Sequence, residues 1–261
     1  MKYSYYQNKK KPPVGEVTDE EVVNIIRHDE KLAHMTLDIR QHLTANDIAT
    51  ADFIKGELPS VTFSARFIGG RRYDKLIEYN GEIPIDLDKK TPEELARISA
   101  AVTRSPFTHI SFTSPKGNGY KLTVQTSLPD GTLPQSPEEV RNYHAHAYDQ
   151  VAALYEELCQ TDIDESGKDM TRICYLPHDE TAYLNPAPQF LIVDLNRPLR
   201  EKKKKTPGRK KAAAATTDTT RCKKPSDNIS YPQSESRSLL ALLLYYHDHK
   251  NKYEEGNRNN Y

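Results

Sequence analysis

The sequence predicts an α+β fold with a mixed, largely antiparallel sheet, and three observations point to it. Segments in which apolar and polar residues alternate recur between about residues 58 and 195, as in half-buried strands. Two helix starts interrupt them, each with a hydroxyl cap, a proline and a glutamate. A helical pattern precedes the first strand. The resulting order, β–α–β–β–α–β after an N-terminal helical cap, is typical of a sheet with helices packed on it.

The N-terminal part is predicted to be a flexible leader followed by helices. Residues 1–16 are polar and contain prolines, so we expect no fixed structure there. Thr18 and Glu21 have the spacing of a capping box, and helical periodicity continues to about Gly56.

The strands and the two later helices follow from local patterns. The predicted helices begin at Thr91 and Ser136 and end near Arg104 and Cys159. The strand 82–88 places three apolar side chains on one face. GGRRYDKLIEYNG is predicted to be a loop followed by a short strand, and we expect the other strands at PSVTFSARF, FTHISFTS, YKLTVQT, RICYLP, ETAYLNP and QFLIVDL.

The composition changes after Asn196, which marks the end of the predicted folded domain, 17–196. Residues 197–224 hold twelve Lys or Arg and two acids, whereas residues 1–196 hold 21 basic and 30 acidic residues. Residues 197–236 are therefore predicted to be a disordered, basic, low-complexity linker, and 237–261 a short helix and tail. A linker of this charge can bind nucleic acid non-specifically.

The bulk composition excludes two classes of protein. No run of 18 apolar residues is present, so we expect no membrane partner and no transmembrane helix. The three cysteines include no CxxC pair, which argues against a disulfide framework and a cysteine-built zinc site. We therefore expect a cytoplasmic protein with reduced thiols.

Two aspartates at the end of the strand 82–88 are the first candidate site. Asp86 and Asp88 are two positions apart, so both side chains lie on one face of the strand. Paired carboxylates repel each other unless a cation lies between them, and Mg²⁺ or Mn²⁺ prefers oxygen ligands. The sequence therefore predicts a metal site here, whereas two solvated acids before a turn are the alternative.

A glycine-containing turn and an acidic loop could complete this site. In SPKGNGYK, the phosphate-binding candidates are Ser114, Lys116 and Lys121. In the acidic loop before the strand RICYLP, one of Asp162, Asp164 and Asp169 could complete a metal triad, and Arg172 could bind a phosphate. An ordinary hairpin and a solvated loop remain the alternatives. Further candidates for phosphate or base contacts are Arg66, Arg71, Arg72, Tyr73 and Tyr79.

Taken together, these motifs resemble the archaeo-eukaryotic primase superfamily, and within it the VirE N-terminal domains of bacterial mobile elements. The resemblance covers about residues 45–195 and is carried by LPSVTFSARF, EYNGEIPIDLDK, FTSPKGNGYKL and DESGKDMTRICYLPHDETAYLNP. It implies an RNA-recognition-like catalytic core with Asp86, Asp88 and Asp164 as metal ligands. One departure is Lys121, which stands where that superfamily has a phosphate-binding histidine.

The function that the resemblance implies is metal-dependent nucleotidyl transfer during replication of a mobile element. The partners would be nucleoside triphosphates, a single-stranded DNA or RNA template, and a helicase or another replication protein. The acidic body and Lys121 leave two alternatives, a catalytically inactive nucleic-acid-binding module of the same fold and an adaptor protein.

Overall fold

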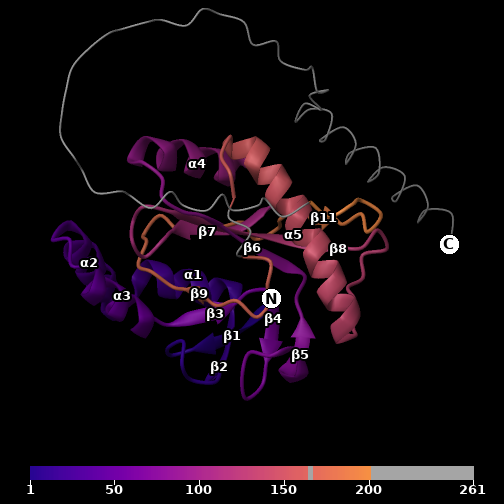
Figure 1. The fold of residues 1–261 in the computed structure, drawn as a ribbon, viewed down its shortest axis with the longest axis horizontal. Coiled ribbons are helices and arrows are strands. Elements are labelled where there is room, and N and C mark those ends of the chain that lie inside the picture. Colours follow the sequence, from indigo (N-terminus) through magenta and orange to yellow (C-terminus); the bar gives the residue numbers. More distant parts are fainter. Residues whose placement is uncertain (164–166, 201–261) are drawn as a thin grey trace, which may run out of the picture. The chain divides into compact units, whose positions relative to one another are not determined.

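The computed structural model describes residues 1–163 and 167–200, and this part of the chain has a mixed α+β fold (Figure 1). Its helices are α1 Asp19–His28, α2 Glu30–Thr44, α3 Ile48–Glu57, α4 Pro92–Arg104 and α5 Pro137–Cys159. Its strands are β1 Lys2–Tyr6, β2 Gly15–Thr18, β3 Ser60–Thr62, β4 Ala65–Phe67, β5 Leu76–Tyr79, β6 Glu82–Leu87, β7 Thr108–Thr113, β8 Tyr120–Ser127, β9 Cys174–Tyr175, β10 Tyr183–Leu184 and β11 Leu191–Ile192.

The predicted helix starts are confirmed, and the capping residues explain them. Thr18, Thr91 and Ser136 each accept a hydrogen bond from the backbone N–H three residues later. In each case a glutamate at that third position accepts a hydrogen bond from the backbone N–H of the capping residue. These contacts satisfy N–H groups that the first helical turn leaves without a partner.

The larger sheet is the one that carries the two aspartates. Its strand order is β10-β7-β8-β11, and β6 also pairs with β8. All its pairings are antiparallel except the one between β11 and β8. Helices α4 and α5 lie on one side of strands β6, β7 and β8, and α1 to α3 lie on the other (Figure 1). The predicted apolar face of β6 is confirmed, because Ile83, Ile85 and Leu87 are fully buried.

The second sheet corrects the prediction for the N-terminus. Residues 1–16 were expected to be a flexible leader, but Lys2–Tyr6 forms β1, which lies between β2 and β3 in the order β2-β1-β3-β9. The Tyr3 and Tyr6 side chains are fully buried. Burying two aromatic rings stabilises the strand, whereas the adjacent run of lysines and prolines made the segment look polar throughout.

The segment 59–67 was expected to be one strand and forms two. Ser60–Thr62 pairs with β1 and β9, whereas Ala65–Phe67 pairs with β5 in a separate two-stranded sheet. The Thr62 hydroxyl donates a hydrogen bond to the Ala65 carbonyl at 2.8 Å and closes the turn between them. The chain therefore changes sheets between β3 and β4, and the loop after β4 leads to β5.

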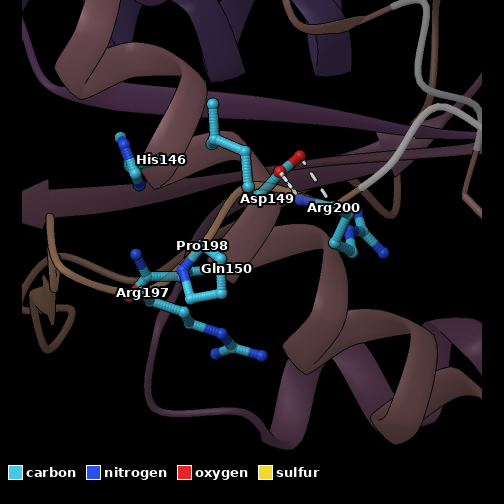
Figure 2. Close-up of a pocket in the computed structure, with 7 residues that line it drawn as sticks. His146, Asp149, Gln150, Arg197, Pro198 and Arg200 are labelled. Atoms are coloured by element: carbon cyan, nitrogen blue, oxygen red, sulfur yellow. Dashed lines mark hydrogen bonds and ion pairs between the residues drawn. The ribbon is translucent and has the colours of Figure 1, made fainter.

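The last described residues return to helix α5. The Gln150 side chain exchanges two hydrogen bonds with the backbone of Asp194, at 2.8 and 3.1 Å. The Arg200 backbone N–H donates to Asp149 at 2.8 Å, beside a small pocket (Figure 2). Of the predicted linker 197–236, residues 201–236 lie outside the described residues, as do the predicted short helix and tail, 237–261. Within the described part, no helix combines the length and apolarity that a bilayer span requires.

Candidate functional site

Asp86 and Lys121 form an ion pair at the end of β6. The antiparallel register between β6 and β8 places Lys121 directly opposite Asp86, and the Lys121 ammonium group contacts Asp86 Oδ1. Only 13% of the Lys121 side chain and 22% of the Asp86 side chain are exposed. The sequence analysis predicted both residues as ligands, but it did not predict that one would neutralise the other.

The ion pair controls the protonation of both groups. Burial alone would raise the pKa of Asp86, but the positive charge of Lys121, its hydrogen bond and the charge of Arg172 lower the pKa below its usual value. Burial alone would lower the pKa of Lys121, but Asp86 outweighs burial and raises it. Both groups are therefore charged near neutral pH, and the aspartate is a carboxylate able to bind a cation.

Asp88 lies beside the turn at 114–119, and Gly119 allows this close approach. A methyl group added to Gly119 would lie 2.9 Å from Asp88 Oδ1, 3.0 Å from the Leu87 carbonyl and 3.1 Å from Ser114 Oγ. A carboxylate, a carbonyl and a hydroxyl oxygen therefore pack closely against Gly119, which has no side chain. The Ser114 hydroxyl is buried and, among the described residues, has no hydrogen-bond partner.

Further cations approach the two aspartates from other elements. The Arg172 guanidinium lies 3.9 Å from Asp86 Oδ2. Burial lowers the pKa of Lys55 on α3, the positive charges of Lys121 and Lys116 lower it further, and the charges of Asp88 and Asp52 oppose the shift. Several cations and carboxylates therefore influence one another at this end of β6.

The predicted third acid is not placed in the site. Asp164 lies outside the described residues, so its role as a metal ligand stays a prediction. Asp169 accepts a hydrogen bond from the Thr171 backbone N–H at 2.9 Å, and its charge acts on Tyr73 and His144. In the described ranges, no three His, Cys, Asp or Glu side chains are arranged to hold a metal ion.

Replacing Gly119 with alanine is expected to destabilise the fold and weaken ligand binding at this site. The added methyl group would contact Asp88, Leu87 and Ser114, which would have to move apart, at a cost of about 1–3 kcal/mol. The free energy of unfolding in urea measures this cost. Gly15→Ala is the matched control, because no atom lies within 4 Å of its added methyl group. Equal stability of the two variants would contradict the close approach at Gly119.

Two other residues predicted to contact a ligand have structural roles. Tyr79 is buried and lies 2.9 Å from the His144 ring, so the prediction that it contacts a base is wrong. Arg66 forms ion pairs with Glu16 and Glu78. These pairs connect β4 with its neighbouring strands and occupy the guanidinium.

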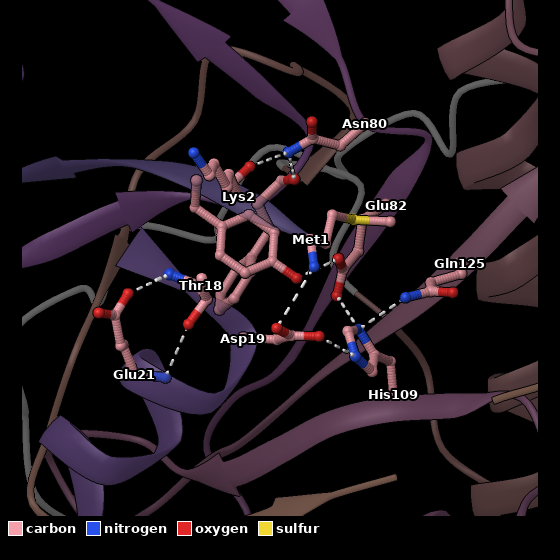
Figure 3. A network of polar contacts seen from close by, with 11 residues as sticks. Met1, Lys2, Thr18, Asp19, Glu21, Asn80, Glu82, His109 and Gln125 are labelled. Carbon is pink, nitrogen blue, oxygen red and sulfur yellow. Dashed lines mark hydrogen bonds and ion pairs between the residues drawn. The ribbon is translucent and has the colours of Figure 1, made fainter. Parts of the chain in front are cut away.

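The sequence analysis missed a buried network around His109 (Figure 3). The two ring nitrogens of His109 lie 2.9 Å from Glu82 and 3.3 Å from Asp19, and the Tyr3 hydroxyl donates to Glu82. Burial alone would lower the pKa of His109, but the charges of Glu82 and Asp19 raise it above its usual value. No sequence spacing indicates this network, because its members come from four separate elements.

His109 is expected to make stability depend on pH. Because its folded-state pKa is raised, the protonated histidine contributes stability that is fully present below about pH 6.5 and is lost as the pH rises through the folded-state pKa. Urea unfolding at pH 6.0 and 8.5 should show wild type losing stability between these values. The His109→Gln variant should lose less over the same interval. Equal losses in both proteins would contradict the charge pairing.

The comparisons with known proteins give one family. The model of the family described as BT4734-like, N-terminal domain, matches residues 54–184, which is half of the 261-residue chain. A search of curated proteins found no match. A search of solved structures likewise found none.

This match corrects the resemblance inferred from the motifs. No primase or VirE family model matches the chain, so its assignment to the archaeo-eukaryotic primases and the VirE N-terminal domains is wrong. The motifs that suggested it are short, and an acidic pair followed by a glycine-containing hairpin is not specific to one family. The matched residues include the strand with Asp86, the hairpin with Ser114 and the segment with Arg172. The chain belongs to the BT4734-like N-terminal domain family.

Proposed function

We propose that this domain is a metal-dependent nucleotidyltransferase whose site binds a nucleoside triphosphate between two aspartates and several cations. The observation that carries the proposal is the meeting of Asp86 and Asp88 with Lys121, Arg172 and Lys55 at one end of β6. Carboxylates and cations beside each other match a ligand that has both a bound metal ion and phosphate groups. In this proposal, helices α1 to α3 form a cap that supplies Lys55.

The donor atoms fit a hard divalent cation such as Mg²⁺ or Mn²⁺. Asp88 Oδ1, the Leu87 carbonyl and Ser114 Oγ all lie close to Gly119, and all three are oxygen atoms. Asp86 adds a carboxylate on the same face of the strand. Oxygen ligands of this kind are those that Mg²⁺ and Mn²⁺ prefer.

In this proposal, Lys121 and Arg172 bind phosphate oxygens. Lys121 is held as a charged ammonium in a mostly buried position, where its attraction for a phosphate is stronger than in water. Arg172 could bind two phosphate oxygens at once through its planar guanidinium. The Ser114 hydroxyl could donate a further hydrogen bond.

The proposed reaction joins a hydroxyl oxygen to the α-phosphorus of the nucleotide, breaks the bond to pyrophosphate and releases the hydroxyl proton to solvent. Lys121 and Arg172 would orient the triphosphate and neutralise the charge that develops on the pyrophosphate. A divalent metal ion, when bound, would supply additional charge stabilisation and activate the hydroxyl. Asp86 and Asp88 would hold that ion.

A second candidate is a domain of the same fold that binds nucleotides or nucleic acid without transferring a nucleotide. The ion pair between Lys121 and Asp86 favours it, because a lysine that neutralises the carboxylate competes with a metal ion for the same oxygen. The two candidates share the phosphate-binding groups and differ in whether Asp86 becomes available to a metal.

Nucleotide incorporation distinguishes these candidates. Purified full-length protein is incubated with Mn²⁺, labelled nucleoside triphosphates and a single-stranded template, and both extended product and pyrophosphate are measured. The proposal predicts both products from the wild-type protein. Binding of the triphosphate with neither product would favour the non-catalytic candidate, and absence of triphosphate binding would contradict both.

The Asp88→Asn variant tests the proposed reaction with little expected effect on the stability of the fold. Asp88 is exposed, so removing its charge should leave the free energy of unfolding almost unchanged. We expect incorporation to fall about 100-fold, as for the loss of one group that stabilises a transition state. Asp38→Asn is the matched control, because Asp38 is also an exposed aspartate and lies on α2 rather than at the end of β6. It should retain most of the wild-type rate.

A further inference from the structure

A strip of positive charge extends from the candidate site across the N-terminal sheet, and we call it the basic edge. It combines side chains from the β1–β2 connection, α3, the loop after β4 and the segment before β9. Its members are Lys9, Lys10, Lys11, Lys55, Arg71 and Arg172. Four of them, the three consecutive lysines and Arg172, are exposed.

The members of the basic edge are connected by direct contacts. The Arg71 guanidinium donates to the Lys9 carbonyl at 3.2 Å and to the Thr171 carbonyl at 3.4 Å. Thr171 is followed by Arg172, which lies 3.9 Å from Asp86. The contacts therefore form a continuous path from Lys9 to the candidate site.

A second path runs along α3. The Lys9 ammonium lies 3.2 Å from the position of a methyl group on Gly56, at the end of α3. Lys55, the preceding residue, approaches the Tyr175 ring to 5.6 Å from its centre. Both paths end beside Lys121, whose charge lowers the pKa of Lys55.

The charge of the basic edge is opposite to that of the surrounding protein. Residues 1–196 contain 21 basic and 30 acidic residues, so six cations at one edge are a local exception. Acids also adjoin the edge: Asp86 lies 3.9 Å from Arg172, and the charges of Asp88 and Asp52 act on Lys55. Lys9, Lys10 and Lys11 are exposed, so they are the members most accessible to a partner.

An aromatic ring accompanies the cations. Tyr175 is half-buried, and the Lys55 ammonium lies 5.6 Å from the centre of its ring. Tyr6, whose ring centre lies 5.7 Å from the Arg71 guanidinium, is fully buried and has a structural role. Cations beside a partly exposed aromatic ring are typical of surfaces that bind single-stranded nucleic acid, because the cations contact phosphates and the ring can stack on a base. A lipid surface would require the charges but not the ring.

We propose that the basic edge binds single-stranded nucleic acid and directs it towards Asp86 and Asp88. This inference rests on the proposed function for the role of the strand as template or acceptor, but binding itself does not depend on catalysis. Lys9, Lys10 and Lys11 lie outside the residues matched by the family model.

The test compares two triple variants of the full-length chain that change charge equally. Lys9→Ala, Lys10→Ala, Lys11→Ala removes the exposed lysines of the basic edge. Lys2→Ala, Lys31→Ala, Arg104→Ala removes three exposed cations elsewhere and serves as the control. The basic residues of 197–224 are present in both proteins and contribute equally. Fluorescence anisotropy with labelled dT20 and rU20 gives affinities between 50 and 200 mM salt.

The inference predicts that the first variant binds the oligonucleotides about ten-fold more weakly than wild type and that its salt slope falls by about 2. The control should stay within about two-fold of wild type. Equal losses in both variants would overturn the inference, as would stronger lysine-dependent binding to phosphatidylserine vesicles than to either oligonucleotide.

Binding of Mn²⁺ and nucleoside triphosphate to the same proteins separates this inference from the proposed function. We expect wild type and both variants to bind the triphosphate equally. Lysine-dependent oligonucleotide binding without triphosphate binding would support the basic edge and contradict the nucleotidyltransferase. Normal triphosphate binding without lysine-dependent oligonucleotide binding would overturn only the basic edge.

Discussion

The Asp86→Asn, Asp88→Asn double variant is expected to lose nucleotide incorporation by about 1,000-fold or more, because it removes both carboxylates proposed to hold the metal ion. Asp86 lies on β6 and Asp88 follows Leu87, its last residue, and among the described residues no set of three His, Cys, Asp or Glu side chains is arranged to hold a metal ion. Affinity for divalent metal should fall with activity. Both are measured on the purified variant, by single-turnover incorporation and by Mn²⁺ titration.

The double variant has a structural effect that must be separated from its chemical effect. Asp86→Asn leaves the Lys121 ammonium mostly buried without its carboxylate, which is expected to destabilise the fold by about 1–3 kcal/mol. Urea unfolding shows whether the variant is folded under assay conditions. A folded double variant with wild-type incorporation would exclude these aspartates from the reaction.

The second large effect is expected from Lys121→Met, which should change the two ligand affinities in opposite directions. Triphosphate affinity should fall about 10- to 100-fold, because a charged hydrogen bond to phosphate is lost. Affinity for Mn²⁺ alone should rise, because Asp86 Oδ1 no longer contacts an ammonium group. Isothermal titration of each ligand separately measures both changes.

Opposite changes would distinguish a lysine that competes with the metal from one that is only structural. Lys31→Met is the control, because Lys31 is exposed on α2, away from β6. It should leave both affinities unchanged. If Lys121→Met lowered both affinities, and the free energy of unfolding fell in parallel, the lysine would act only by holding β6 and β8 together.

Local sequence patterns predicted the helices and the acidic strand. The capping pairs at Thr18, Thr91 and Ser136 each involve residues three positions apart, so the sequence contains all the information that each helix start needs. Alternation of Ile83, Ile85 and Leu87 likewise predicted the buried face of β6. Each of these patterns involves residues that are close together in the sequence, within a helical turn or one strand.

The incorrect or missing predictions concern contacts between distant segments. β1 is stabilised by pairing with β3, about 55 residues away, so a polar composition next to prolines concealed it. The ion pair between Asp86 and Lys121 depends on strand register, which is set by the whole β6–β8 pairing. His109 could not be linked to Glu82 and Asp19 without the fold. The family assignment failed for another reason, because short motifs were given more weight than their specificity allowed.

Diffraction from crystals soaked with Mn²⁺ and a non-hydrolysable nucleoside triphosphate tests whether Asp86 and Asp88 hold a metal ion beside the triphosphate. We predict an anomalous manganese peak bound by Asp86 and Asp88, with the Lys121 ammonium moved from the carboxylate to a phosphate oxygen. Manganese absent from the end of β6, with Lys121 still paired to Asp86 and the nucleotide bound elsewhere, would contradict it.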